Sequence, residues 1–206
     1  MKLAERKMKL FLSTVIAIFG FQFAFSQSFE GVIDMTTRNP QKNETAEIEW
    51  HLKNGQHRLD YNSVSGDYTA TYSLVVANNS AKLVSSTGST TNIPIASLLK
   101  ENYDLGGYYV TEQNPNQKVF GFACNKYVIQ AKDYLVEYWI SDNTGLSLND
   151  FPEFMRKGLL APVNDLQANG IPVKIQVKDV NGKMIYSQTI SEVDSGSVDN
   201  SLFQVN

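Results

Sequence analysis

The residues of this sequence that could do acid–base or nucleophilic chemistry are two histidines, one cysteine and twenty-one carboxylates. A histidine pair could bind a metal ion, which requires both rings next to the metal. A histidine could also act as a catalytic base, which requires contact with the group that it deprotonates. Cys124 is the candidate thiol nucleophile, with Lys126 as a nearby cation. The motifs H-E-x-x-H, G-x-S-x-G, the P-loop and G-x-G-x-x-G are absent from the sequence.

The spacing of these residues favours structural roles. His51 and His57 flank an Asn-Gly turn whose register places them on opposite faces of a hairpin, so they cannot share a metal. Cys124 alternates with Phe120 and Phe122 along one strand face, which predicts a buried and slow-reacting thiol. Carboxylate pairs suited to glycoside hydrolysis occur by chance in any acidic β protein, and none stands out. We therefore expect no enzyme, no cofactor and no catalytic or metal-binding residue; a hydrolase with unidentified carboxylates is the alternative.

The first 26 residues have the pattern of a secretory signal peptide. Residues 1–9 carry four basic side chains and one acidic one, residues 10–25 are almost wholly apolar, and Ala24 and Ser26 are small. The alternative, an uncleaved membrane anchor, needs roughly 20 apolar residues. We predict cleavage between Ser26 and Gln27. The mature protein is then periplasmic or secreted, without a lipid anchor or a membrane span.

Charge and cysteine content exclude several classes of protein. Removal of residues 1–26 changes the formal net charge from −3 to −6, whereas a nucleic-acid partner requires a basic surface. A single cysteine excludes a disulfide scaffold. No repeat or linker interrupts the rest of the chain, which is long enough to bury one core. We predict a single β-rich domain over residues 27–206.

The clearest structural element is a β-hairpin over residues 46–62. Its centre, Asn54-Gly55, suits a type I′ turn because both residues tolerate positive φ angles. This turn fixes a register that pairs Trp50 with Leu59, Ile48 with Tyr61 and Leu52 with His57 on an apolar face. The opposite face pairs His51 with Arg58 and is expected to meet solvent.

Further strands extend the β pattern along the chain. A second hairpin over residues 171–193 turns at Asn181-Gly182 and pairs Val177 with Tyr186. Six other strands are predicted at residues 28–37, 69–78, 81–86, 108–112, 119–130 and 134–140, and residues 85–92 are predicted to form a polar loop. About ten strands in one antiparallel array indicate a mainly β fold, a curved sheet or an open half-barrel.

Helix is expected in two places, residues 95–103 and a segment that begins near Asp150. In the second, Asp150 suits the N-cap and Pro152 the first turn. Phe151, Phe154, Met155 and Leu159 form one apolar stripe at helical spacing. Pro162 ends or kinks that helix, and a shorter helix continues over residues 163–169. We expect one or two short helices to pack on the concave face of the sheet.

The segment Gly121–Tyr127, GFACNKY, resembles the G-[YF]-x-C-x-[KR]-Y stretch of a family of exported Gram-negative proteins described as a domain of unknown function. Residues 52–60, 138–140 and 201–205 fit the same family pattern. That family is similar to the LolA and LolB lipoprotein carriers. The resemblance implies an open β half-barrel with helices in its mouth, and it brings no catalytic residues.

Two classes of function remain open. The first is an exported binding protein that holds a lipid, an acyl chain or a lipidated protein on the apolar concave face. The residues expected to line this site are Trp50, Leu52, Leu59, Tyr61, Phe151, Phe154, Met155 and Leu159. The alternative is a structural module with a filled core that binds another envelope protein. A connected apolar cavity of at least ~300 Å3 distinguishes the first class from the second.

Overall fold

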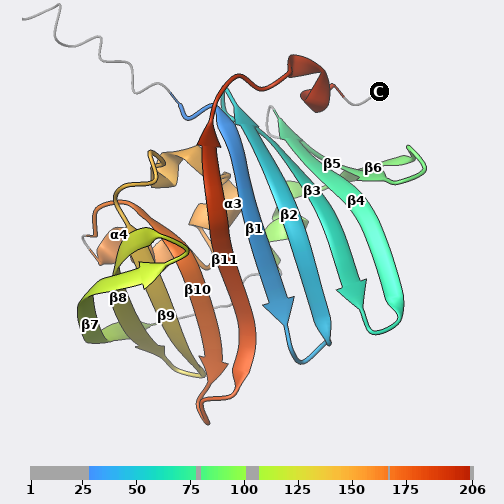
Figure 1. The fold of residues 1–206 in the computed structure, drawn as a ribbon. Helices are drawn as coiled ribbons and strands as arrows, with labels where there is room; N and C mark the ends of the chain where they lie inside the picture. Colours follow the sequence, from blue (N-terminus) through green and yellow to red (C-terminus); the bar gives the residue numbers. More distant parts are fainter. Residues whose placement is uncertain (1–27, 78–79, 101–106, 167, 205–206) are drawn as a thin grey trace, which may run out of the picture.

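The computed structural model describes residues 28–77, 80–100, 107–166 and 168–204. The predicted signal peptide, residues 1–26, lies outside these ranges, so its cleavage stays a prediction. Eleven antiparallel strands form one open sheet in the order β6-β5-β4-β3-β2-β1-β11-β10-β9-β8-β7 (Figure 1). The strands are β1 Gly31–Asn39, β2 Glu44–Lys53, β3 Gln56–Ser65, β4 Tyr68–Ala77, β5 Ser80–Ser85, β6 Thr90–Ile93, β7 Tyr108–Val119, β8 Phe122–Ala131, β9 Tyr134–Ser141, β10 Ile171–Asp179 and β11 Met184–Ser195. The predicted fold class is confirmed.

The β2–β3 hairpin has the predicted turn and register. Asn54 and Gly55 have φ angles of 51° and 71°, as a type I′ turn requires. Trp50 lies opposite Leu59, and His51 lies opposite Arg58. We name the sheet face that carries Trp50 the inner face and the face that carries His51 the outer face.

The β10–β11 hairpin differs from the prediction in its turn. Val177 pairs with Tyr186 as expected, but only Gly182 of the predicted Asn-Gly pair has a positive φ angle, 79°. The amide of Gly182 donates to the carbonyl of Asp179, which closes a type I turn one residue earlier. The side chain of Asp179 accepts from the amides of Asn181 and Lys183 and so favours this turn.

Two other predicted segments are corrected. Residues 85–92 were expected to form a loop, yet β6 pairs with β5 from Thr90 onward. Val119 ends β7 rather than beginning β8, because Phe120 and Gly121 form the turn, with φ angles of 46° and 88°. Phe120 is therefore exposed at a hairpin tip and does not share a buried face with Cys124. Cys124 itself is buried, as expected.

The helix predicted from Asp150 is shorter than expected. The described helices are α2 Ile95–Lys100, η1 Leu148–Asp150, α3 Glu153–Arg156, α4 Ala161–Asp165 and η2 Asn200–Phe203. The predicted helix from Asp150 fails near Gly158, a weak helix former, because α3 already ends at Arg156. Pro162 was expected to end or kink this helix, since it has no amide to donate and crowds the preceding turn. Pro162 instead lies in the first turn of α4. Residues 101–103 of the other predicted helix lie outside the described residues.

The core lies between the inner face and the segment that contains η1, α3 and α4. Trp50 is 0% exposed, and its ring meets the edge of Phe151 at a centroid distance of 5.0 Å. The buried hydroxyl of Tyr138 on β9 donates to the carbonyl of Leu159 over 2.7 Å, and the hydroxyl of Tyr108 on β7 donates to Asp165 of α4. Burial raises the pKa of Tyr138, so this donor keeps its proton. These two bonds hold the helical segment against the sheet.

The chain after β11 covers part of the outer face. Arg58 donates from Nη1 to the carbonyl of Leu202 over 3.0 Å, and Phe203 of η2 is buried. His51 is therefore only 8% exposed, although its register placed it on the face expected to meet solvent. The register was right and the exposure was wrong, because a segment distant in sequence covers this part of the sheet.

Candidate ligand-binding groove

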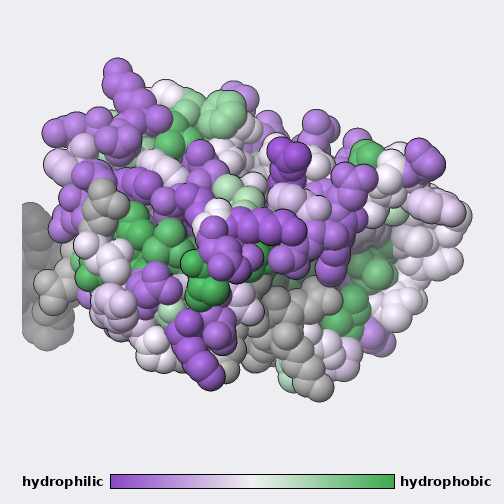
Figure 2. Space-filling view, turned by 90° about the horizontal axis from the view of Figure 1, so that it is seen from below, coloured by the Kyte–Doolittle hydropathy of each residue, from purple (hydrophilic) through white to green (hydrophobic). Residues whose placement is uncertain are grey.

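A groove of about 780 Å3 lies between the inner face and α3. Its walls are mainly apolar, and Asn39, Gln41 and Lys42 of the β1–β2 turn form part of its polar rim. It opens at the end of the sheet that carries this turn. Seen from below, toward that end, apolar residues show in gaps between hydrophilic ones (Figure 2). The volume is within the range of roughly 300–1,000 Å3 that small-molecule sites occupy.

Four of the eight residues predicted for the ligand site line this groove: Tyr61, Phe154, Met155 and Leu159. They come from β3 and from the helical segment opposite it. Tyr61 also stacks on Tyr72 of β4 at a centroid distance of 4.8 Å.

The other four predicted residues do not line the groove. Trp50, Leu52 and Leu59 belong to the closed core, because Phe151 and its neighbours cover this end of the inner face. Phe151 is itself in the core and also lines a second cavity. The alternating pattern of the hairpin identifies its apolar face, but it contains no information about which part of that face the helical segment covers.

The sequence analysis missed several groove residues. They are Leu74 of β4, Leu98 of α2, Tyr134 of β9, Ile175 of β10, and Ile185 and Tyr186 of β11. The apolar side of the second hairpin, with Ile175 and Tyr186, was a usable signal. The sequence did not reveal the strand order. In the sheet β2, β1 and β11 lie between β3 and β10, and both of these strands contribute residues to the groove.

A second cavity of about 430 Å3 is lined by residues of α3 and lies beside Gly55 of the β2–β3 turn. Its walls include His57, Asn149 and Arg156, and Phe154 lines both this cavity and the groove. Burial lowers the pKa of His57 to about 4; the Asp150 carboxylate opposes the shift and the Arg156 charge adds to it. His57 is therefore neutral at pH 7.

The outer face carries a partly buried polar cluster around Asp60. His51 Nε2 lies 3.3 Å from an Asp60 oxygen and 3.1 Å from Glu49, while Arg58 Nε donates to Asp60 over 2.8 Å. Burial alone would raise the Asp60 pKa, but hydrogen bonds from His51, Ser73 and Arg58 lower it to about 2. In a hydrolytic triad the imidazole lies between hydroxyl and carboxylate. Here Asp60 lies between His51 and Ser73, so His51 is not placed to activate the hydroxyl.

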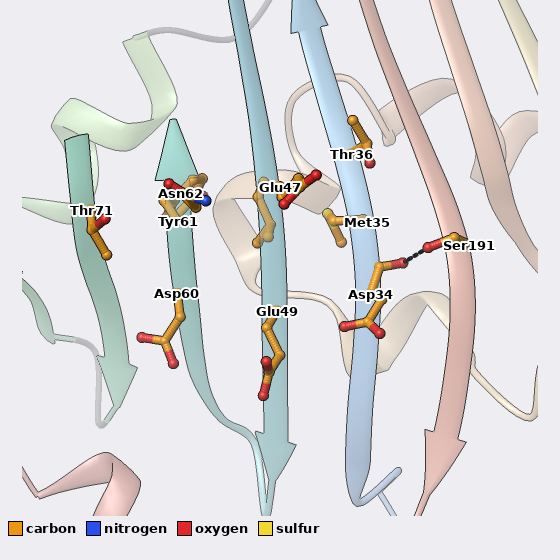
Figure 3. A pocket seen from close by; sticks show the side chains of 11 residues that line it. Asp34, Met35, Thr36, Glu47, Glu49, Asp60, Tyr61, Asn62, Thr71 and Ser191 are labelled. Carbon is orange, nitrogen blue, oxygen red and sulfur yellow. Dashed lines mark hydrogen bonds between the residues drawn. The ribbon is translucent and has the colours of Figure 1, made fainter. Parts of the chain in front are cut away.

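Carboxylates also line a shallow outer pocket of about 500 Å3. Asp34 of β1 lies opposite Glu49 of β2, which lies opposite Asp60 of β3. Figure 3 shows these side chains on three neighbouring strands, with the Ser191 hydroxyl bonded to the main-chain oxygen of Asp34. Among the described residues, no group of three or more histidine, cysteine or acidic side chains is arranged to hold a metal ion.

Fold and site together define an open antiparallel sheet whose inner face and short helices enclose an apolar groove. The chain belongs to the DUF4412 family, a domain of unknown function whose model matches residues 29–206. The match confirms the expectation that the chain belongs to a domain of unknown function. No curated protein matches the sequence. In the part of the chain that the structure describes, no helix is both long and apolar enough for a membrane crossing.

Solved structures with a similar fold include three of different origin. The complex of Pseudomonas aeruginosa MucA and MucB matches with 13% identity and a TM-score of 0.49, covering 87% of this chain and 56% of that chain. This chain thus spans little more than half of the length of that neighbour. An uncharacterised conserved protein from Thermus thermophilus matches with 8% identity and a TM-score of 0.50, covering 85% of this chain and 84% of that chain.

The third is a putative outer membrane lipoprotein-sorting protein domain from Vibrio parahaemolyticus. It matches with 10% identity and a TM-score of 0.35, covering 86% of this chain and 90% of that one. At these identities the likeness concerns the fold alone.

Proposed function

We propose that this protein is a non-enzymatic binding protein of the cell envelope that holds the apolar part of a lipid, an acyl chain or a lipidated protein. The observation that carries the proposal is the groove of about 780 Å3 between the inner face and α3. Burial of an acyl chain in the groove removes apolar surface from water and favours binding by about 25 cal/mol per Å2 of surface buried.

The helical segment over the groove suits entry of a ligand. Met155 and Leu159 are only partly buried, and α3 is a single turn of four residues, Glu153–Arg156. Such a short helix gains little stability from its own hydrogen bonds, so its position depends on packing. A ligand that replaces this packing can move the segment without breaking the sheet.

The envelope location rests on the signal-peptide pattern of residues 1–26. Cleavage at Gln27 gives a periplasmic or secreted protein. The intact mass of the protein, purified after export from the cell that makes it, tests the envelope location separately from the groove. A mass that retains residues 1–26 contradicts the location and leaves the groove untouched.

Competition with an apolar fluorescent dye tests the groove. We expect N-phenyl-naphthylamine to bind the wild-type protein at one site, and decanol to displace it. Leu159→Lys places a charge on the groove wall and is expected to lower dye affinity at least ten-fold, since the bound apolar dye would remove water from that charge without pairing it. The matched control is Val180→Lys, at an exposed hairpin tip. Equal binding by both variants, or no binding by the wild type, contradicts the proposal.

A second candidate function is a protein-interaction module. It is favoured by Asp34 and Glu49, because like charges directly opposite on neighbouring strands are unfavourable and a cationic partner would relieve them; Asp60, the next carboxylate in the row, already pairs with Arg58. Binding of a heptalysine peptide, lost in Asp34→Asn and weakened by salt, would support this function. Dye binding in the groove with no heptalysine binding would exclude it.

A further inference from the structure

Two buried ring nitrogens, one on a residue that lines the second cavity and one on the residue packed against it, have no hydrogen-bond partner among the described residues. They are Nδ1 of His57 and Nε1 of Trp50. His57 is 6% exposed, lines the cavity, and has its ring centroid 5.7 Å from that of Trp50. Buried polar groups are nearly always hydrogen-bonded, so the unpaired Nδ1 of His57, a residue that lines the cavity, indicates a partner that the described part of the chain does not supply.

Arg156 adds a charged donor to the same cavity. Its Nε donates to the carbonyl of Phe151 over 3.1 Å, and its terminal amino groups have no partner in the described part of the chain. The nearby carboxylates are already engaged. Glu153 pairs with Lys157, and Asp150 accepts from the amides of Phe29 and Ser147.

These groups define the chemistry of the missing partner. Indole and guanidinium groups can only donate hydrogen bonds, and neutral imidazole can offer Nδ1 as a donor. The partner must therefore carry acceptor atoms. The positive charge of Arg156 makes an anionic oxygen the best acceptor, because charge-assisted hydrogen bonds are about twice as strong as neutral ones.

The second cavity adjoins the apolar groove at a single side chain. Phe154 lines both spaces, and it belongs to the short helix α3. If this ring moved aside, a polar cavity of about 430 Å3 and an apolar groove of about 780 Å3 would form one space. The two spaces together would suit an amphipathic molecule, whose polar head would lie beside His57 and whose apolar chain would lie beside Leu159.

We propose that the cavity formed by His57, Asn149 and Arg156 binds the acidic headgroup, a carboxylate or a phosphate, of the amphipathic ligand whose chain occupies the groove. This inference rests on the proposed function. It adds a preference for an acid over a neutral molecule with the same chain.

Decanoate and decanol provide the test, since they share a chain and differ in the headgroup. In dye competition at pH 7, the wild type is expected to bind decanoate roughly ten-fold more tightly than decanol, as one charge-assisted hydrogen bond predicts. Arg156→Gln removes this preference and leaves decanol affinity within about two-fold. Lys118→Gln, an exposed charge on β7 that lines neither space, changes neither affinity.

Nuclear magnetic resonance of labelled His57 gives a second measurement that requires no variant. Decanoate is expected to shift the Nδ1 resonance, and decanol is not. Equal affinities for acid and alcohol in the wild type, or an unchanged preference in Arg156→Gln, overturn the headgroup site while the groove proposal stands. Failure of both ligands to bind refutes the proposed function. If acetate or inorganic phosphate shifts His57 at the concentrations at which decanoate does, the cavity is a site for free anions, and the headgroup assignment is wrong.

Discussion

The buried imidazole of His57 predicts a specific dependence of stability on pH. Burial lowers its pKa from 6.5 to about 4 in the folded protein. Between these values the unfolded chain binds a proton that the folded protein does not. The free energy of unfolding therefore falls as the pH drops from 6.5 toward 4, and the His57 contribution is constant above this window.

The size of the effect follows from the shift. Each pH unit within the window changes the free energy of unfolding by about 1.4 kcal/mol, so His57 removes about 2 kcal/mol at pH 5 and about 3 kcal/mol at pH 4. This is a large share of the roughly 5–15 kcal/mol by which a domain is stable.

Urea unfolding followed by tryptophan fluorescence, at half-unit steps from pH 7 to pH 4, measures the dependence. His57→Gln removes the titrating group and is expected to show a shallower slope between pH 6.5 and 5. Carboxylates with lowered pKa values, such as Asp60 at about 2 and Glu137, lose their contributions at lower pH and are common to both proteins. Identical slopes for wild type and variant would refute the argument that His57 is buried as a neutral ring.

Three further predictions concern stability and reactivity. Trp50→Ala should lower the free energy of unfolding by about 3–5 kcal/mol, because it empties a fully buried site. His51→Ala should cost only about 1 kcal/mol, because Asp60 keeps its bonds from Arg58 and Ser73 and Glu49 is exposed to water; urea midpoints that rank His51→Ala as more damaging would contradict this order. Cys124, 3% exposed and with its pKa raised by burial, should react with Ellman's reagent only on unfolding, and rapid labelling of native protein would contradict its burial. Gly170→Ala should prevent stable folding or lower the melting temperature strongly, since its φ is +99° and a Cβ would lie 1.9 Å from the carbonyl oxygen of Ser141; a variant as stable as wild type would show that this backbone is wrongly placed.

The part of the fold that the sequence predicted is the part fixed by local chemistry. Asn54-Gly55 determines its own turn and therefore the pairing of Trp50 with Leu59. The second turn was harder, because the side chain of Asp179 shifts it by one residue. The helix from Asp150 was predicted too long because its apolar stripe outweighed Gly158, a weak helix former, and only Pro162 was expected to interrupt it.

The site required information that no local pattern contains. Tyr61, Phe154, Met155 and Leu159 were predicted because their own elements have an apolar side. Which inner-face residues stay open depends on where Phe151 packs, and this places Trp50 and Leu59 in the core. In the same way, the burial of His51 depends on η2, a segment far along the chain.

Nuclear Overhauser effects between decanoate and the methyl groups of the protein test the central claim most directly. Binding in the groove predicts cross-peaks from the methylene protons of the chain to Leu74, Met155 and Leu159, which line it. Val64, an exposed residue of β3 outside the groove, should give none. Cross-peaks to Val64 as strong as those to Leu159, or none to any groove methyl group at saturating decanoate, would contradict the account.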